Sequence, residues 1–211
     1  MAPYIIVAVI AYLIGSVNFS VILSKKMAGF DVREKGSGNA GTTNMLRTVG
    51  KKAALYTLIL DILKGVVAVL IAILIGTLFK EFEAKDVLIG IAGIFVIIGH
   101  TFPIFFKFKG GKGIATSLGV LLITNWQIGL ICLVFALILM ALTRMVSVGS
   151  IAAAILYPVL TVFIYQNFLI EGNHMTYIIA SIIVSVLVIF NHRENVKRLL
   201  AGTENKLSFN K

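Results

Sequence analysis

The sequence predicts an all-α polytopic membrane protein of about seven transmembrane helices, with its N-terminus outside and its C-terminus in the cytoplasm. Of the 211 residues, 59% are hydrophobic and 13% are charged, and the mean hydropathy is +1.00. A soluble domain averages about 45–50% apolar and about 25% charged residues, and a chain this short cannot bury such an excess. No segment alternates with the period of two that marks a strand. Composition therefore excludes an ordinary soluble enzyme, a disordered tail and a disulfide scaffold.

Five stretches are long and apolar enough to cross a bilayer, which takes about 20 residues for about 30 Å of hydrocarbon. The first of them lacks a basic start, so we expect it to be a span and not a cleaved signal peptide. The five are Pro3–Leu23, Ala53–Phe79, Val87–Phe106, Met145–Leu169 and Met175–Phe190.

The stretch Gly113–Leu142 is also apolar but is too long for a single span. As one helix it would be about 45 Å long at 1.5 Å per residue. Residues 124–126, Thr-Asn-Trp, supply turn residues and an interfacial aromatic near its middle. We therefore predict two short helices, Gly113–Ile123 and Gln127–Leu142, which bring the count to seven.

The charge distribution supports this topology. The chain has 19 Lys and Arg against 9 Asp and Glu, a net charge of +10. Seven spans place 16 of these 19 basic residues in inner segments, with Lys80 and Lys85 outside and Lys64 within a span. Such a bias follows the positive-inside rule. A membrane therefore accounts for the basic charge, and no nucleic-acid partner is expected.

The first polar segment, residues 35–47, has three glycines within six residues. Glycine lets backbone N–H groups approach an anion closely. Thr42 or Thr43 is predicted to cap a short helix that carries Arg47. A helix start beside a glycine-rich loop suits phosphate, and Arg47 offers a bidentate clamp. The alternative is a loop that only turns the chain, with Arg47 on lipid headgroups.

The second polar segment contains Gly-Gly-Lys-Gly at residues 110–113, followed by a predicted helix. Backbone N–H groups, a lysine and the positive end of a helix dipole again favour an anion. The Walker A pattern needs Ser or Thr after the lysine, and Gly113 stands there, which argues against an ATPase. His100, at the end of a span, is either a structural histidine or a base.

The third polar segment, residues 191–200, closes the last span. On a helix His192 and Asn195 share a face, and Glu194 lies one turn from Arg198 as a predicted pair. The alternative is an amphipathic end held on anionic lipid by basic residues.

Four more polar residues lie in or beside spans. Asp61 and Lys64 are one turn apart, where ionisable groups usually face a polar interior, so they either pair with each other or contact substrate. Ser147 and Ser150 begin a span, either as helix caps or, for Ser150, as part of the inner site.

Three motifs now stand in order along the chain: Gly-Ser-Gly-Asn-x-Gly-x-Thr-Asn-x-x-Arg at 36–47, Gly-His-x-x-Pro-x-Phe-x-x-Phe-Lys-Gly-Gly-Lys-Gly at 99–113, and His-Arg-Glu-Asn at 192–195. Together they resemble the PlsY-type bacterial glycerol-3-phosphate acyltransferases, which take the acyl group from acyl phosphate. The resemblance implies that residues 1–211 form a single integral membrane acyltransferase domain in the bacterial cytoplasmic membrane, with its site facing the cytoplasm. It implies acyl transfer to the sn-1 hydroxyl of glycerol 3-phosphate, giving lysophosphatidic acid and phosphate in phospholipid biosynthesis.

The resemblance implies no cofactor and no metal. Its expected partners are glycerol 3-phosphate, acyl phosphate, membrane lipid and the soluble enzyme that produces acyl phosphate. Carried over by position, Glu194 is structural, and the catalytic residues are Ser37, Arg47, Lys112, Ser150, His192 and Asn195. The substrate- and phosphate-binding residues are Gly36, Gly38, Asn39, Gly41, Thr43, Asn44, Lys109, Gly110, Gly111 and Gly113.

The general base stays open at this point. The sequence lacks the His-x4-Asp dyad of acyl-CoA and acyl-carrier acyltransferases, so either the substrate phosphate or His192 takes the hydroxyl proton. Two other classes compete with the enzyme: a transporter of phosphate esters, which would often show internal repeats, and a lipid-binding structural protein.

Overall fold

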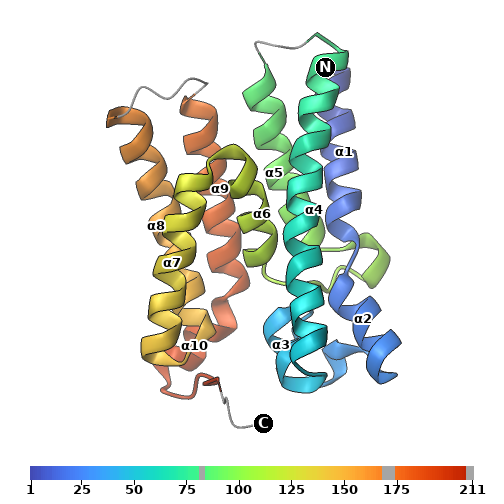
Figure 1. Cartoon of the computed structure of the whole chain (residues 1–211), viewed down its shortest axis with the longest axis vertical. Helices are drawn as coiled ribbons and strands as arrows, with labels where there is room; N and C mark the ends of the chain where they lie inside the picture. Colours follow the sequence, from blue (N-terminus) through green and yellow to red (C-terminus); the bar gives the residue numbers. More distant parts are fainter. Residues whose placement is uncertain (81–83, 168–173, 208–211) are drawn as a thin grey trace. The chain divides into compact units, whose positions relative to one another are not determined.

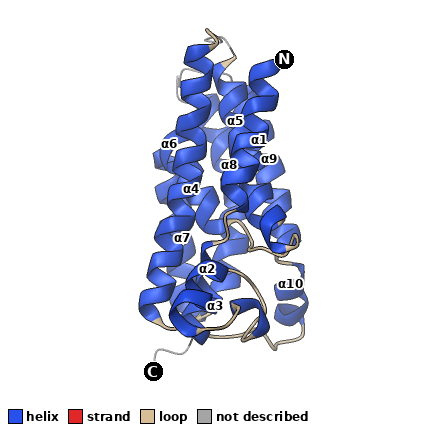
Figure 2. Ribbon diagram, turned by 90° about the vertical axis from the view of Figure 1, so that its right-hand side faces the viewer, coloured by secondary structure: helices blue, strands red, loops and turns tan. Residues whose placement is uncertain are grey.

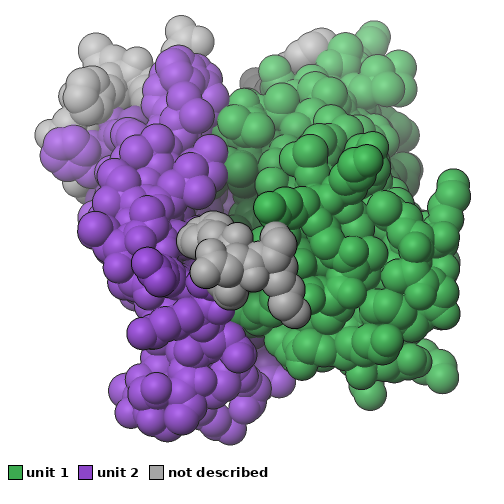
Figure 3. All heavy atoms as spheres, turned by 60° about the horizontal axis from the view of Figure 1, so that its bottom comes forward, with its two compact units in different colours: residues 1–124 green, residues 125–211 purple. Residues whose placement is uncertain are grey.

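The computed structural model describes residues 1–80, 84–167 and 174–207, and these residues form helices and loops without any strand (Figure 2). Six of the helical segments within them are long and apolar enough to cross a membrane. The predicted all-helical membrane fold is confirmed. The chain divides into two compact units, Met1–Thr124 and Asn125–Lys211 (Figure 3).

Unit 1 is built on four helices that pack against one another, with two shorter helices at the end of the unit away from the N-terminus (Figure 1). The packed helices are α1 (Ala2–Ser16), α4 (Lys51–Leu78), α5 (Lys85–Thr101) and α6 (Ile114–Thr124). The shorter ones are α2 (Phe19–Ala28) and α3 (Thr42–Thr48), and two 3-10 turns, η1 (Val32–Glu34) and η2 (Ile104–Phe106), complete the unit.

Glycine pairs bring the helices of unit 1 together. A Cβ added to Gly15 on α1 would strike the carbonyl oxygen of Val96 on α5, and one added to Gly99 on α5 would strike that of Tyr12 on α1. Gly65 on α4 and Gly119 on α6 make the same reciprocal close approach. Small residues at helix crossings are the usual way to gain contact between helices in a bilayer.

Unit 2 contains α7 (Trp126–Thr143), α8 (Val146–Asn167), α9 (His174–Asn191) and α10 (Arg193–Leu200), with α8 packed on α7 and on α9 (Figure 1). Asn125 caps α7, because its side chain accepts a hydrogen bond from the backbone N–H of Ile128 at 3.0 Å. The predicted division of the 113–142 stretch at this turn is confirmed.

Two predicted spans differ from the structure. Pro3–Leu23 is interrupted at Val17 and Asn18, between α1 and α2. Val87–Phe106 ends as a helix at Thr101, because the chain turns at Phe102 and Pro103 into η2.

The number of spans stays a prediction. The predicted short span Gly113–Ile123 corresponds to α6. This helix has 11 residues and is therefore only about 16 Å long. The predicted end of the span at Leu169 lies outside the described residues.

Candidate active site

A buried ion pair lies beside the interruption of the first span. Lys64 Nζ lies 2.9 Å from Asp61 Oδ1, and each side chain is 3% exposed. Lys64 also donates to the carbonyl oxygens of Gly15 at 3.1 Å and Val17 at 3.0 Å, where α1 ends. The structure thus supports mutual pairing of Asp61 and Lys64. Lys64 in addition binds backbone carbonyl groups at the break between α1 and α2.

Directly after the break, Asn18 caps a second helix, and this helix leads toward the first glycine-rich loop. Its side chain accepts from the backbone N–H of Val21 at 3.2 Å and from the Ser20 hydroxyl at 2.7 Å. An asparagine at this position is a strong N-cap. The resulting helix, α2, leads into η1 and residues 35–41.

Asn44 shapes the first glycine-rich loop, residues 35–41. This side chain is 1% exposed and its Oδ1 accepts from the backbone N–H of Ser37 at 2.9 Å. Its Nδ2 lies within 3.0 Å of three backbone carbonyl oxygens, those of Val32, Lys35 and Asn39. The polar groups of Asn44 are therefore engaged by the loop itself, which fixes where the loop points its own N–H groups.

The cap of α3 differs from the prediction. Neither Thr42 nor Thr43 is the N-cap, because α3 begins at Thr42 and Gly41 is the capping residue, without a side-chain hydrogen bond. Arg47 lies in the last turn of α3, and its side chain and that of Ser37 are exposed.

The second glycine-rich loop, residues 107–113, folds back onto the end of α5. The N–H of Gly110 donates to the Thr101 carbonyl at 3.0 Å, and that of Gly111 to the His100 carbonyl at 3.1 Å. A Cβ on Gly111 would strike the His100 ring and lie 2.7 Å from the Ala40 carbonyl oxygen. Space therefore requires glycine at position 111. Lys112, the next residue, is half-buried.

His100 lies beneath this second loop as part of the buried polar cluster. Its Nδ1 is 3.6 Å from Asp61 Oδ1, and the side chain is 6% exposed. Contact with both the ion pair and Gly111 favours the structural interpretation of His100 over the role of a base.

Arg33 lies in η1, directly before the first glycine-rich loop, and binds the second, a contact that the sequence did not predict. Its Nη1 donates to the carbonyl oxygens of Phe106 at 2.7 Å and Lys109 at 3.1 Å. Its Nε and Nη2 bind the two carboxylate oxygens of Asp31 at 3.0 and 2.7 Å, and these bonds hold the pKa of Asp31 below its usual value. The Asp-x-Arg spacing at 31–33 was the available signal for a local pair, but nothing local indicates the contact with residues 106–109.

Unit 2 holds the other predicted catalytic residues, Ser150, His192 and Asn195, and all three are buried. His192 stands between α9 and α10, with Nδ1 2.8 Å from the Val188 carbonyl oxygen. Since a carbonyl oxygen only accepts, Nδ1 is the donor in this contact, which leaves Nε2 as the acceptor atom when the ring is neutral.

Glu204 is a buried residue of unit 2 that no sequence motif indicated. It accepts hydrogen bonds from Ser147, Asn195 and Arg198. Burial favours the neutral carboxyl, but these hydrogen bonds outweigh burial and hold the pKa of Glu204 below its usual value.

The predicted pair of Glu194 with Arg198 is wrong. Glu194 instead lies 3.1 Å from Lys197, one turn along α10, with both side chains exposed. Arg198 turns to Glu204, which the chain brings back beside α10.

The chain resembles known proteins along nearly its whole length. A family model described as glycerol-3-phosphate acyltransferase matches residues 5–202. The glycerol-3-phosphate acyltransferase of Clostridioides difficile (strain 630) is 43% identical over 210 residues, covering 97% of this chain and 95% of that protein. That of Thermoanaerobacter pseudethanolicus is 44% identical over 203 residues, with 96% and 95% covered.

Two solved structures are also similar. One is the glycerol 3-phosphate form of PlsY (YgiH), described as an integral membrane glycerol 3-phosphate acyltransferase, with a TM-score of 0.83 and 35% identity over 97% of this chain and 96% of that one. The other is the lysphosphatidic acid form, with a TM-score of 0.81 and 34% identity over 97% and 95% of the two chains.

The role of Asn44 yields a first prediction. Replacing Asn44 with Asp places a carboxylate oxygen against three carbonyl oxygens, and losing such buried hydrogen bonds costs about 1–3 kcal/mol. We expect hydrogen exchange of the amides of residues 35–41 to become at least about tenfold faster, as measured by mass spectrometry. Asn125→Asp is the matched control, because only the oxygen of Asn125 is used and Asp caps equally well. Unchanged exchange in Asn44→Asp would contradict the role given to this side chain.

Proposed function

The chain belongs to the glycerol-3-phosphate acyltransferase family of integral membrane enzymes of the PlsY type, and we propose that its acyl donor is acyl phosphate and its acceptor the sn-1 hydroxyl of glycerol 3-phosphate. The products would be lysophosphatidic acid and inorganic phosphate. The proposal assigns this one activity to the whole of residues 1–211.

The observation that carries the proposal is the pair of glycine-rich loops in unit 1 that Arg33 joins. Both substrates carry a phosphate group, and cationic side chains lie in or directly after both loops. Lys109 and Lys112 belong to the second loop, and Arg47 follows the first on α3. Fixed N–H donors and cations are the groups that bind phosphate in proteins.

Acyl phosphate makes the chemistry one of charge stabilisation. It is a mixed anhydride of a fatty acid and phosphoric acid, so phosphate is already a good leaving group. The acceptor oxygen attacks the acyl carbon, and the bond from that carbon to the phosphate oxygen breaks, with its electron pair going to phosphate. Negative charge develops on the intermediate and on the departing phosphate, and preorganised donors and cations stabilise such charge most effectively. We assign Arg47 and Lys112 to this task.

The hydroxyl proton has two candidate acceptors. We favour the phosphate of glycerol 3-phosphate, which is part of the substrate and close to its own hydroxyls. His192 is the alternative, and its neutral tautomer, with the lone pair at Nε2, suits a base. Ser37, Ser150 and Asn195 are proposed as hydrogen-bonding groups for the substrates.

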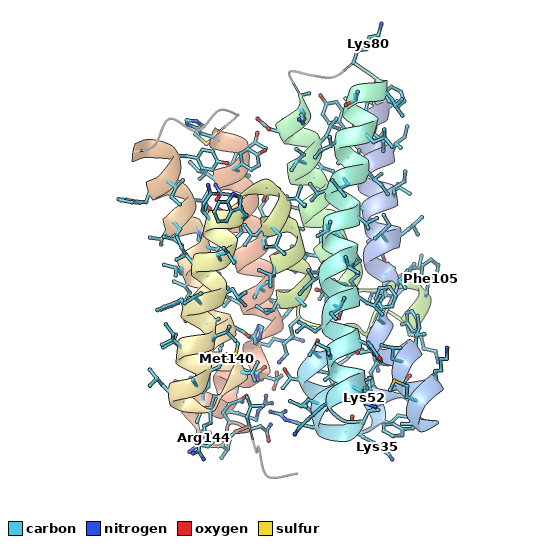
Figure 4. The ribbon with its side chains drawn as sticks, viewed as in Figure 1. Lys35, Lys52, Lys80, Phe105, Met140 and Arg144 are labelled. Atoms are coloured by element: carbon cyan, nitrogen blue, oxygen red, sulfur yellow. The ribbon has the colours of Figure 1, made fainter. Side chains whose placement is uncertain are left out.

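The proposed location is the bacterial cytoplasmic membrane, with the loops facing the cytoplasm. Lys35 and Lys52 lie at one end of unit 1 and Lys80 at the opposite end (Figure 4), and the charge bias along the sequence favours the former end as the inner one. The proposal includes the soluble enzyme that produces acyl phosphate as a partner at this face.

A direct assay tests the proposed reaction. The purified protein, supplied with acyl phosphate and glycerol 3-phosphate, should release lysophosphatidic acid and phosphate in equal amounts, with the acyl chain at sn-1. Product formation from acyl-CoA but not from acyl phosphate would contradict the donor. A transporter or a lipid-binding protein would form no product from either.

Variants of the second loop test its role in binding phosphate. Lys112→Ala removes a charge-assisted contact of about 1.5–3 kcal/mol, which predicts a loss of about 10- to 100-fold in kcat/KM. Gly111→Val should do comparable damage without removing charge, because a Cβ there strikes His100 and approaches Ala40. Lys80→Ala, at the opposite end of unit 1, is the control. Normal kinetics in both loop variants, at equal amounts of folded protein, would make the loop a simple turn.

Labelling in intact cells tests the orientation. With buried Cys132 replaced by Ala, a membrane-impermeant maleimide should label Lys80→Cys from outside but leave Lys35→Cys unreactive until the membrane is opened. Both lysines are exposed, so access alone decides the result. Labelling of Lys35→Cys from outside would reverse the proposed topology.

A further inference from the structure

A hook at the end of α10 brings the chain back onto that helix. The N–H of Gly202 donates to the Leu199 carbonyl at 3.1 Å, and that of Thr203 to the Arg198 carbonyl at 2.8 Å. These two bonds, with Gly202 at a φ of +68°, form the Schellman motif that ends many helices. Glycine takes this left-handed conformation at little cost. Residues 201–207, which we call the hook, therefore run back along α10.

The hook places one carboxylate among three donors. Glu204 Oε1 accepts from Asn195 Nδ2 at 2.7 Å and from Ser147 Oγ at 2.9 Å, and Oε2 accepts from Arg198 Nε at 2.8 Å. The residue is only 8% exposed. A fourth hydrogen bond, from the N–H of Leu207 to the Arg144 carbonyl at 2.7 Å, fixes the hook to the turn between α7 and α8. Glu204 thus connects α10, on which Asn195 lies, to the start of α8. Ser150 lies on this same helix, α8.

We propose that Glu204 is a positioning residue for the acyltransferase reaction, which acts by orienting the side-chain amide of Asn195. The inference rests on the proposed function, in which Asn195 contacts substrate. A carboxylate only accepts hydrogen bonds, so Asn195 must turn its NH₂ group toward Glu204. The carbonyl oxygen of the amide is then held on the opposite side, as an acceptor of fixed direction. An unrestrained asparagine would sample both amide orientations.

The bond to Ser147 extends this effect to α8. Ser147 and Ser150 are three residues apart and therefore neighbours on one face of the helix. Binding Ser147 to the carboxylate that holds Asn195 fixes the start of α8 relative to α10. Glu204 thereby sets the spacing of two proposed substrate-binding side chains that lie 45 positions apart in the sequence.

A double-mutant cycle tests whether Glu204 acts through Asn195. We expect Glu204→Ala to lower kcat/KM at least about tenfold, since hydrogen bonds to charged groups are among the strong ones. In an Asn195→Ala background the same change should cost no more than about twofold, because the group that Glu204 orients is already gone. Each variant is measured at equal amounts of folded protein, with its Tm recorded. Lys206→Gln, an exposed change in the same hook, should leave kcat/KM unchanged.

The outcomes separate positioning from simple support of the fold. A purely structural role would lower Tm while leaving kcat/KM per folded molecule unchanged, and that result overturns the inference. Equal losses in both backgrounds overturn it as well, because Glu204 would then act independently of Asn195. If Glu204→Ala does not fold, the cycle is run with Glu204→Gln, which keeps the size and one acceptor oxygen. Wild-type protein that forms no lysophosphatidic acid would refute the proposed function instead.

Discussion

The architecture of unit 1 depends on the hydrogen bonds that Lys64 donates to the carbonyl oxygens of Gly15 and Val17. A chain that leaves its helix within a membrane-spanning segment exposes carbonyl groups, and each unsatisfied group costs several kcal/mol in an apolar medium. Lys64 supplies the missing donors, and Asp61 at 2.9 Å balances its charge. The first apolar segment can therefore break at Val17, restart as α2 and lead the chain into the loop that Asn44 holds.

Single polar side chains that bind several groups at once also restrain the glycine-rich loops. Glycine-rich loops have many conformations to lose on folding, so they keep one shape only where other groups restrain them. Asn44 restrains the first loop from inside, and Arg33 joins it to the second. In unit 2 a buried carboxylate, Glu204, restrains α8 and α10. In each case one polar side chain makes three or more hydrogen bonds to backbone or side-chain groups of other segments.

The sequence predicted the features that depend on local pattern and missed those that depend on distant contacts. Apolar runs and the turn at Asn125 gave the helices, because burial in lipid and capping are local properties. The capping of α3 by Gly41 in place of Thr42 or Thr43 is a local feature that the sequence did not predict. Glu194 pairs with Lys197 within α10, while Arg198 binds Glu204 from the segment that follows the helix. The motifs include Asn44 and Asn195 but not Glu204. No sequence pattern near Glu204 predicts that the hook brings it back to α10.

A match of motifs identifies residues without distinguishing their roles, and the structure separates two kinds among them. Ser37 and Arg47 are exposed, and Lys112 is half-buried. Asn44 belongs to the same motif as Ser37, yet its side-chain oxygen and nitrogen are engaged by the loop backbone. Stabilisation of developing charge depends on donors that are already in place when the charge forms. In the proposed reaction, side chains that hold the loops in shape, such as Asn44, are therefore as much a part of the chemistry as the exposed cations.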